Sequence, residues 1–349
     1  MSEAVDIPAL EDLAAAVREG LGLHPETDVE VSEVTEHSNF NYVYRASVEG
    51  VAVYLKVAAA RPKRFPIPLP RRRLFAEAEA IHRFGELCGD GIRVPDVLFL
   101  DRQRFVLGLT DVGEGRDVLL GLLPQGYDLL VEQAAALGGA LARVHRGTRG
   151  SSAFRPPEED ALVRRVIYEG LLAPGAKGLF PHLWDEVWQE MSTSRECLVH
   201  ADLWSKNLLV APGRPLAVVD FEGAHLGDPA FDLATLLAAA LIPVLDDPGL
   251  APRCRELIGS LRDGYLRGSG RPQWAEGALT RAYRFTGTFL AARGFGPFAY
   301  EMSTFGRLRL AALAVVLTAE PPPDAAVFQR RIAEALRRRR VAAELAAPR

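Results

Sequence analysis

Along this chain, apolar residues first recur at helical spacing and then alternate with polar ones. Over 8–21 they fall at every third or fourth position, which predicts an opening helix. Over 51–57 three aliphatic residues share one side of an extended chain with Tyr54 and Lys56 on the other, which predicts a half-buried strand. A further apolar run, 105–113, is typical of a strand that ends in a turn. The N-terminal third is therefore expected to be rich in strands.

A predicted helix after residue 73 carries an acid on its apolar face. Leu74 and Ile81 lie one above the other on that face, and Glu77 lies between them. A carboxylate among apolar side chains needs a partner, and Lys56 is the natural candidate. A lysine on a strand is ordinarily solvated, so it is the position of Glu77 on the apolar face of the helix that favours a pair between Lys56 and Glu77. Glu79 is the rival acid, but it falls on the other side of the helix.

The rest of the chain has mainly helical periodicity. Apolar helices are predicted over 130–145, where His145 is expected to be packed or capping, and over 233–241. An arginine-rich helix over 325–345 could pack, form a homodimer or lie in solvent. We therefore expect an α+β chain with two lobes, a strand-rich one over 1–112 and a larger, mainly helical one over 113–349.

Residues 198–221, LVHADLWSKNLLVAPGRPLAVVDF, concentrate the polar chemistry. Two short apolar runs flank a Pro-Gly-Arg-Pro turn and predict a hairpin. Asn207 precedes the first strand and Asp220 follows the second, so the hairpin brings both to the same open end. Their oxygens are hard ligands of the kind that Mg²⁺ prefers, and Asp202 adds a carboxylate nearby.

His200, Asp202 and Asn207 fit H-x-D-x-x-x-x-N, and Asp220 follows 13 residues later, a spacing found in protein-kinase-like catalytic loops. The next segment, FEGAHLGDPAFDLATLL, contains a D-x-E pair ending at Glu222 and a G-D-P-x-x-D-L-A pattern. With these motifs the chain resembles the aminoglycoside phosphotransferase and choline kinase superfamily, which includes the methylthioribose kinases. The resemblance implies a bilobal protein-kinase-like fold with an antiparallel sheet in the N-terminal lobe.

The resemblance also implies roles for the residues of this loop. Asp202 would accept the proton of an acceptor hydroxyl, with His200 beside it in the catalytic motif. Asn207 and Asp220 would hold Mg²⁺, with help from Glu222. The superfamily's usual glycine before the catalytic aspartate is Ala201 here, a change of one methyl group that we expect to matter little.

On the nucleotide side, the resemblance assigns Lys56, paired with Glu77, to the phosphates of ATP or GTP. An asparagine-rich turn over 36–44 is similar to the N-x-N-x-V-[YF] turn of methylthioribose kinases, and an ordinary hairpin tip is the alternative. The candidates there for covering the phosphates are Ser38, Asn39 and Asn41. The strand over 105–113 is similar to the superfamily's hinge strand, and its candidates for the adenine edge are Thr110, Asp111 and Val112.

A short interval distinguishes this chain from a protein kinase. Only eleven residues separate Asp220 from Asp232, and a helical run follows at once, which leaves little room for a peptide-docking platform. We therefore expect transfer of the γ-phosphoryl group to a hydroxyl of a small metabolite or antibiotic. A nucleotide-binding pseudokinase or regulatory protein of the same fold is the alternative, and retention of Asp202 argues against it.

The charge balance gives a weak indication of the acceptor. Over 233–320 there are ten arginines and no lysine against seven acids, which favours a neutral or anionic acceptor such as a sugar over a polycation. The candidates for substrate contact are Trp204, which could equally be a packed aromatic, Arg307 and Arg309. A proline-rich connector over 61–73 is expected to be exposed, and its six basic residues could steer anions or simply be solvated.

The composition of the chain argues against several other classes of protein. A net charge of −4 gives no electrostatic case for nucleic acid, and no run of about 18 apolar residues predicts a membrane span. Three scattered cysteines form neither a zinc motif nor a disulfide framework, so a cytoplasmic location is expected. The partners expected are a nucleotide and a small hydroxyl-bearing substrate.

Overall fold

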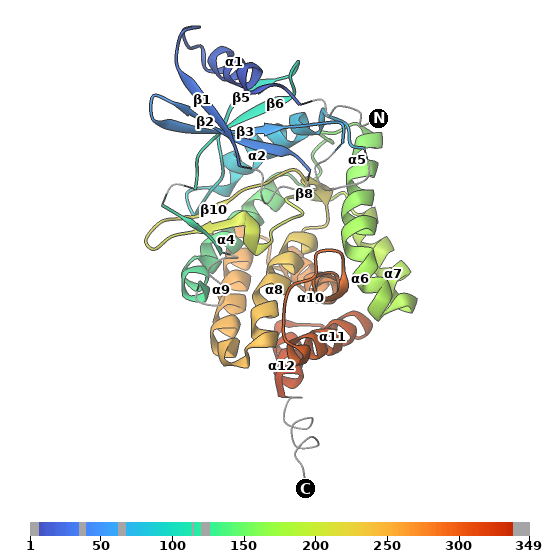
Figure 1. Cartoon of the computed structure of the whole chain (residues 1–349). Helices are drawn as coiled ribbons and strands as arrows, with labels where there is room; N and C mark the ends of the chain where they lie inside the picture. Colours follow the sequence, from blue (N-terminus) through green and yellow to red (C-terminus); the bar gives the residue numbers. More distant parts are fainter. Residues whose placement is uncertain (1–6, 35–39, 62–67, 114, 120–125, 338–349) are drawn as a thin grey trace.

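The computed structural model describes residues 7–34, 40–61, 68–113, 115–119 and 126–337 of the 349-residue chain. A sheet-bearing lobe, coloured blue to teal, stands on a larger lobe of helices coloured green to red (Figure 1). The predicted α+β arrangement of two lobes is confirmed.

The N-terminal lobe is built on a five-stranded sheet in which every neighbouring pair is antiparallel. Its strands, in spatial order, are β1 (Val29–Glu33), β2 (Tyr42–Val48), β3 (Val51–Val57), β6 (Val106–Thr110) and β5 (Val97–Asp101). The aliphatic residues of β3 pack in one hydrophobic core with the buried face of α1 (Leu10–Leu21). Tyr54 and Lys56 point to the other side of the sheet, toward the second lobe. Both the opening helix and the alternating strand are therefore confirmed.

Helix α2 (Arg73–Cys88) lies between the two lobes. Leu74, Glu77 and Ile81 are all buried on it, as the apolar stripe predicted. Its Phe84 ring meets the ring of Phe221 edge-on with centroids 5.2 Å apart, which ties the helix to the chain just after the hairpin. The acid on this stripe is thus held at the boundary of the lobes.

The predicted hairpin forms within a second, smaller sheet. Its strands β9 (Leu208–Val210) and β10 (Leu216–Val218) are antiparallel, and the N–H of Val219 donates to the carbonyl of Asn207 at 3.1 Å. Asn207 and Asp220 therefore lie at the same end of the hairpin, as expected. The outer strands are β4 (Ile92–Arg93) beside β10 and β7 (Asp117–Val118) beside β9; a separate pair joins β8 (Cys197–Val199) to β11 (His225–Gly227).

The larger lobe is built mainly of helices, and one of them, α8, is buried along nearly its whole length. The helices are α4 (Tyr127–Gly147), α5 (Pro157–Arg164), α6 (Ala173–Leu179), α7 (Pro181–Thr193), α8 (Ala230–Asp246), α9 (Ala251–Ser269), α10 (Pro272–Phe295), α11 (Thr304–Ala319) and α12 (Ala325–Arg337), with short π- and 3₁₀-helical segments at Arg165–Leu172, Ser205–Asn207 and Pro248–Leu250. Two glycines bring α4 and α9 into backbone contact: a Cβ on Gly138 would lie 2.2 Å from the Leu261 carbonyl oxygen. A Cβ on Gly264 would lie 2.1 Å from that of Ala135.

Residues of both basic segments make contacts inside the fold. Arg73, predicted to lie in an exposed connector, is instead the first residue of α2, and it is buried with its guanidinium donating to the side chain of Asn41 and to the carbonyl of Ala59. The arginine-rich helix packs, in its described part, through Phe328, which stacks on Tyr283. No helix within the described ranges is long and apolar enough to cross a membrane.

Candidate active site

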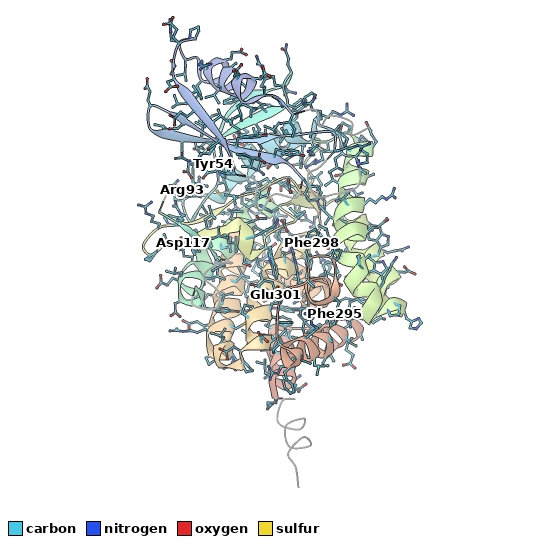
Figure 2. All side chains as sticks on the ribbon, in the orientation of Figure 1. Tyr54, Arg93, Asp117, Phe295, Phe298 and Glu301 are labelled. Carbon is cyan, nitrogen blue, oxygen red and sulfur yellow. The ribbon has the colours of Figure 1, made fainter. Side chains whose placement is uncertain are left out.

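An interlobe cleft of about 480 Å³ opens between the two sheets. Figure 2 shows Tyr54 on the N-terminal lobe above it. The cleft takes its walls from both lobes, and among its lining residues are Lys56, Glu77, Thr110, Asp111, Val112, Lys206, Asn207 and Asp220. The structure therefore brings the predicted hinge strand, the lysine and two of the predicted metal ligands around one space.

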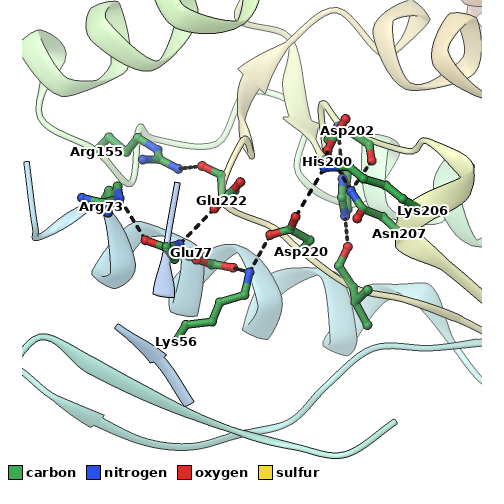
Figure 3. Close-up of polar contacts among 12 residues, drawn as sticks. Lys56, Arg73, Glu77, Arg155, His200, Asp202, Lys206, Asn207, Asp220 and Glu222 are labelled. Carbon is green, nitrogen blue, oxygen red and sulfur yellow. Dashed lines mark hydrogen bonds and ion pairs between the residues drawn. The ribbon is translucent and has the colours of Figure 1, made fainter. Parts of the chain in front are cut away.

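Lys56 is the charged centre of this cleft (Figure 3). Its ammonium forms an ion pair with Glu77 and a second one with Asp220 at 2.6 Å. Burial alone would lower the pKa of Lys56, but the carboxylates of Asp220 and Glu77 raise it above its ordinary value. Burial alone would raise the pKa of Asp220, but Lys56 and Lys206 bring it down to about 2. The lysine and the aspartate therefore stay charged at neutral pH.

A buried polar network continues from this pair. The side-chain amide of Asn41 donates to Glu222 at 3.0 Å and to Glu77 at 3.4 Å, and its oxygen accepts from Arg73 at 3.1 Å. Arg155 donates to the backbone carbonyl of Glu222. Asn41, predicted to cover phosphates, thus uses its side chain to join two acids. Ser38 and Asn39, its companions in that prediction, lie outside the described residues.

The carboxylate of Asp232 fixes the backbone of the catalytic loop. It accepts the N–H groups of His200 and Ala201, each at 2.9 Å, and lies 3.1 Å from the Nε2 of His145, which is packed as expected. Ala201 has a φ of +65°, in the left-handed region that costs an L-residue about 1–2 kcal/mol. The methyl group of Ala201 therefore stands at a strained position, and the expectation that it matters little stays a prediction.

His200 is bonded within the loop and is not among the described residues that line the interlobe cleft or the side pocket. It is fully buried, its Nε2–H donates to the carbonyl of Val219 at 3.1 Å, and its Nδ1 accepts the N–H of Asp202 at 3.2 Å. Burial lowers the pKa of this imidazole, so the ring is neutral. We therefore correct its predicted catalytic role to a positioning role.

Asp202 is oriented by two neighbours. Its Oδ2 accepts from the side-chain amide of Asn207 at 2.8 Å and pairs with Lys206 at 2.9 Å. Because the amide nitrogen of Asn207 also donates to the backbone carbonyl of Asp202, the opposite side of that amide presents an oxygen. Lys206 lies 3.9 Å from Asp220 as well, so it bridges the two aspartates.

A second cavity, which we call the side pocket, adjoins Asp202. It has a volume of about 220 Å³ and receives residues from the catalytic loop, the segment before α6, α8 and the end of α10. Its lining residues are Phe40, Ile167, Leu171, Leu172, Ala201, Asp202, Trp204, Lys206, Phe231, Thr235, Phe289, Ala292, Arg293, Phe298 and Tyr300. Lys206 lines both cavities, so it stands at the junction between the interlobe cleft and the side pocket.

The oxygen donors fit a hard divalent cation that is completed by phosphate oxygens. Asp220 supplies an anionic oxygen, Asn207 a neutral one, and Glu222 belongs to the same buried network. Among the described residues, no group of three or more His, Cys, Asp or Glu side chains could hold a metal ion by itself. Such an incomplete set suits Mg²⁺, which keeps waters and nucleotide phosphates as ligands.

Of the predicted substrate contacts, the structure supports one position. Trp204 lines the side pocket. Arg307 and Arg309 are not among the described residues that line either cavity, because their places on α11 direct them to backbone carbonyls: Arg307 donates to Gly294 at 2.6 Å and Arg309 to Leu245 at 2.7 Å. Their prediction as substrate contacts is corrected accordingly.

Two cations at the site were missed in the sequence. Lys206 lies four residues after Asp202, within the motif H-x-D-x-x-x-x-N itself, so its place in that motif could have identified it. Arg293 lies at the end of α10, with its guanidinium 3.5 Å from the Oδ1 of Asp202 and 4.5 Å from the ring of Trp204. No local pattern distinguishes it from the other arginines of that region.

Comparison with known proteins agrees with this geometry. A family model described as the phosphotransferase enzyme family matches residues 51–280. The 4-hydroxytryptamine kinase of Psilocybe cubensis is 27% identical over 206 residues, which are 52% of this chain and 55% of that protein. The match therefore spans about half the length of that curated relative.

Solved structures of the same fold cover nearly the whole chain. An amicoumacin kinase in complex with AMP-PNP, Ca²⁺ and Ami is 18% identical, with a TM-score of 0.53 over 88% of this chain and 92% of its own. A choline/ethanolamine kinase family protein from Mesorhizobium loti is also 18% identical, with a TM-score of 0.50 over 95% of this chain and 100% of its own. These likenesses confirm the protein-kinase-like fold.

Proposed function

The chain belongs to the phosphotransferase enzyme family, and we propose that it transfers the γ-phosphoryl group of ATP or GTP to a hydroxyl of a small molecule. One observation carries the proposal: Asp202 stands at the junction of two cavities, beside the lysine that lines both of them. A nucleotide in the interlobe cleft and an acceptor in the side pocket would meet at this junction.

The Oδ1 of Asp202 is the oxygen that we assign to the acceptor hydroxyl. Its Oδ2 is already engaged by Asn207 and Lys206, which fix the carboxylate in place. A carboxylate within hydrogen-bond reach orients the hydroxyl and takes its proton as the bond to phosphorus forms. Lys206 is placed to stabilise negative charge on the group in transit.

The phosphates are assigned to Lys56, and the metal to Asn207 and Asp220 with Glu222. When bound, Mg²⁺ would neutralise charge on the β- and γ-phosphates. Glu77 holds the ammonium of Lys56 from the helix side, so its position is set before nucleotide arrives. We keep the backbone of the turn over 36–44, with Ser38, Asn39 and Asn41, as the segment that covers the phosphates.

The adenine edge is assigned to two backbone groups. The N–H of Thr110 already donates to Asp96 at 3.0 Å, and the carbonyl of Val112 already accepts from Arg116 at 2.9 Å. The carbonyl of Asp111 and the N–H of Val112 lie between them and have the acceptor and donor character that adenine requires. The Asp111 side chain itself accepts from Gly113 in a turn.

The proposed acceptor is a ring-bearing hydroxyl compound, either a sugar or an aromatic alcohol. Trp204, Tyr300 and Phe298 give the side pocket aromatic walls, and both kinds of ring stack on such walls. The name of the Psilocybe relative, 4-hydroxytryptamine kinase, likewise describes an aromatic alcohol as acceptor.

Nucleotide binding and turnover test the proposal separately. Mg²⁺ with ATP or GTP should raise the unfolding temperature, more than either component alone, by an amount that grows with the logarithm of ligand concentration above the dissociation constant. A screen of sugars, aminoglycosides, amino alcohols and aromatic alcohols should then give acceptor-dependent release of ADP or GDP. Binding without transfer to any acceptor would favour the alternative, a nucleotide-binding pseudokinase or regulatory protein.

A further inference from the structure

We propose that Arg293 makes the side pocket specific for acceptors that carry a carboxylate next to their aromatic or apolar body. The inference rests on the proposed function, because it names the class of acceptor for the same site. It begins from the charge of the lining residues. Those of the side pocket that carry a formal charge are Asp202, Lys206 and Arg293. Asp202 pairs with Lys206 at 2.9 Å and with Arg293 at 3.5 Å, so the three side chains together leave one net positive charge on the wall of the cavity.

Arg293 has hydrogen-bonding capacity to spare. Within the described part of the chain its guanidinium makes one ion pair, with Asp202 at 3.5 Å, and no hydrogen bond. A guanidinium carries five N–H donors in a planar fork, and it stays charged at neutral pH even though burial lowers the pKa of Arg293. The fork therefore has free donors of the geometry that binds a carboxylate through two parallel hydrogen bonds.

The neighbours of Arg293 hold it in this position. Its guanidinium lies over the ring of Trp204, and Trp204 meets the ring of Tyr300 edge-on at 6.2 Å. The N–H of Tyr300 donates to the carbonyl of Arg293 at 2.6 Å, which ties the chain after α10 back to the helix. A side chain fixed by stacking loses little further entropy when it binds an anion. The three residues thus form a preorganised anchor.

The acidic groups nearby do not cancel this preference. Glu301, which Figure 2 shows near Phe298 on the larger lobe, is exposed, so water and salt screen its charge. Glu222 lines a small adjoining pocket of about 50 Å³ and accepts a hydrogen bond from Asn41. A polycationic acceptor would meet a wall with one net positive charge and few carboxylates, which disfavours its binding.

A carboxylate suits the anchor better than a phosphate. The transferred phosphoryl group reaches the same junction with its own negative charge, and a dianion beside it would be repelled. A monoanion is balanced by the one arginine. The pocket thus favours a hydroxy acid whose hydroxyl meets Asp202 while its carboxylate meets Arg293.

A series of acceptors that share one ring but differ in charge distinguishes the effect of the carboxylate on binding from that of the ring. We would measure kcat and KM with Mg-ATP for hydroxyphenylpropanoic acid, its primary amide, the corresponding amine and a phosphorylated analogue. Wild type should use the acid with a kcat/KM at least about 10-fold above the amide, as expected for a charge-assisted pair, and should use the amine and the phosphorylated analogue less well. Equal kcat/KM for acid, amide and amine, or a preference for the phosphorylated analogue, would overturn the inference and leave the phosphotransferase proposal intact.

Variants locate the preference in one side chain. Arg293→Gln should raise KM for the acid about 10- to 100-fold, change kcat little and leave the amide nearly unaffected, and Arg293→Lys should recover part of the loss. An equal fall in kcat for every acceptor would show that Arg293 only positions Asp202, which would overturn the anchor. Arg307→Gln is the matched control, because that arginine lies outside the cavity. Mg-ATP binding, measured with each variant, confirms that the fold is intact.

Discussion

The interlobe cleft and the side pocket meet at Lys206 but are built in different ways. The cleft is organised by buried charges in direct contact, with Lys56 between Glu77 and Asp220. The side pocket is organised by Trp204, which meets the ring of Tyr300 edge-on, and by Arg293, whose guanidinium lies over the ring of Trp204. A cleft built from charges suits the one ligand that every member of such a family shares, the metal-bound triphosphate, whereas an apolar pocket can be reshaped for each acceptor. We therefore expect the cleft to determine the class of reaction and the side pocket to determine which acceptor is used.

The largest effect that separates the two regions should come from Asp202→Asn. Loss of the carboxylate that receives the hydroxyl proton should lower kcat about 10²–10⁴-fold. Mg-ATP affinity should stay near the wild-type value, because Asp202 lines the side pocket and not the cleft. Steady-state kinetics and calorimetric titration of nucleotide measure the two quantities. Asp185→Asn, at an exposed position on α7, is the control, and wild-type turnover by the Asp202 variant would remove this residue from the mechanism.

Lys56→Met should act on the cleft instead. It leaves the carboxylate of Glu77 buried without its cation and that of Asp220, which is half-buried, with only Lys206 nearby, so the free energy of unfolding should fall by about 3–5 kcal/mol. Nucleotide affinity should fall as well. Denaturant unfolding gives the first quantity, and Lys177→Met, at an exposed lysine on α6, is the matched control. Equal stability of both variants would show that the buried pair has no structural role.

A smaller, pH-dependent effect should come from His225, which packs edge-on against Phe231 of the side pocket. His225 is fully buried, its Nδ1–H donates to Gly223 at 2.8 Å, and its Nε2 accepts from the hydroxyl of Tyr168. Burial, with the nearby charge of Arg164, holds the pKa of this imidazole well below its ordinary value. The unfolded chain takes up a proton near pH 6.5 and the folded one does not. Stability is therefore present above about pH 6.5 and lost as the pH falls toward the folded pKa.

The contribution of His225 should be about 1.4 kcal/mol per pH unit below that point. Free energies of unfolding measured at several pH values, from about 7.5 down to about 5, would give the slope of stability against pH. His225→Asn keeps a donor toward Gly223 and should flatten the slope by one proton. The exposed His182→Asn should leave it unchanged. A slope that is the same in all three proteins would contradict the buried neutral ring.

The smallest effect should come from Ala201→Gly. Glycine adopts the φ of +65° without strain, so the free energy of unfolding should rise by about 1 kcal/mol even after the greater entropy of the unfolded chain is counted. Ala211→Gly, at a buried alanine outside the left-handed region, should instead lower it by about 0.5–1 kcal/mol. Thermal unfolding of the two variants gives the comparison, and a loss of stability in both would show that Ala201 is not strained.

The cleft could be predicted from the sequence because its signals are local. Alternation placed Lys56 on the inner face of β3, and helical spacing placed Glu77 opposite it. A hairpin of two short strands then brought Asn207 beside Asp220. Each step depends on residues close together in the chain, where period and turn chemistry determine geometry.

The pocket could not be predicted in the same way. Arg293, Phe298 and Tyr300 reach Asp202 only through the packing of α10 in the larger lobe. The excess of arginine over lysine suggested a preference for neutral or anionic acceptors, which stays a prediction. It could not show which arginine lines the cavity, because composition gives no helical phase, and neither Arg307 nor Arg309 is among the lining residues. The positive φ of Ala201 could not be predicted either, since an alanine in the sequence gives no sign of a left-handed backbone conformation.

The most direct test of the central claim is the fate of the γ-phosphate. Wild-type protein would be incubated with Mg-ATP labelled at that phosphate and with an acceptor selected by the screen, and the products separated by chromatography. The account predicts label in an organic phosphate monoester that forms only when acceptor and Mg²⁺ are present, and almost none with Asp202→Asn. Label that appears solely as inorganic phosphate, at a rate that no acceptor changes, would contradict it.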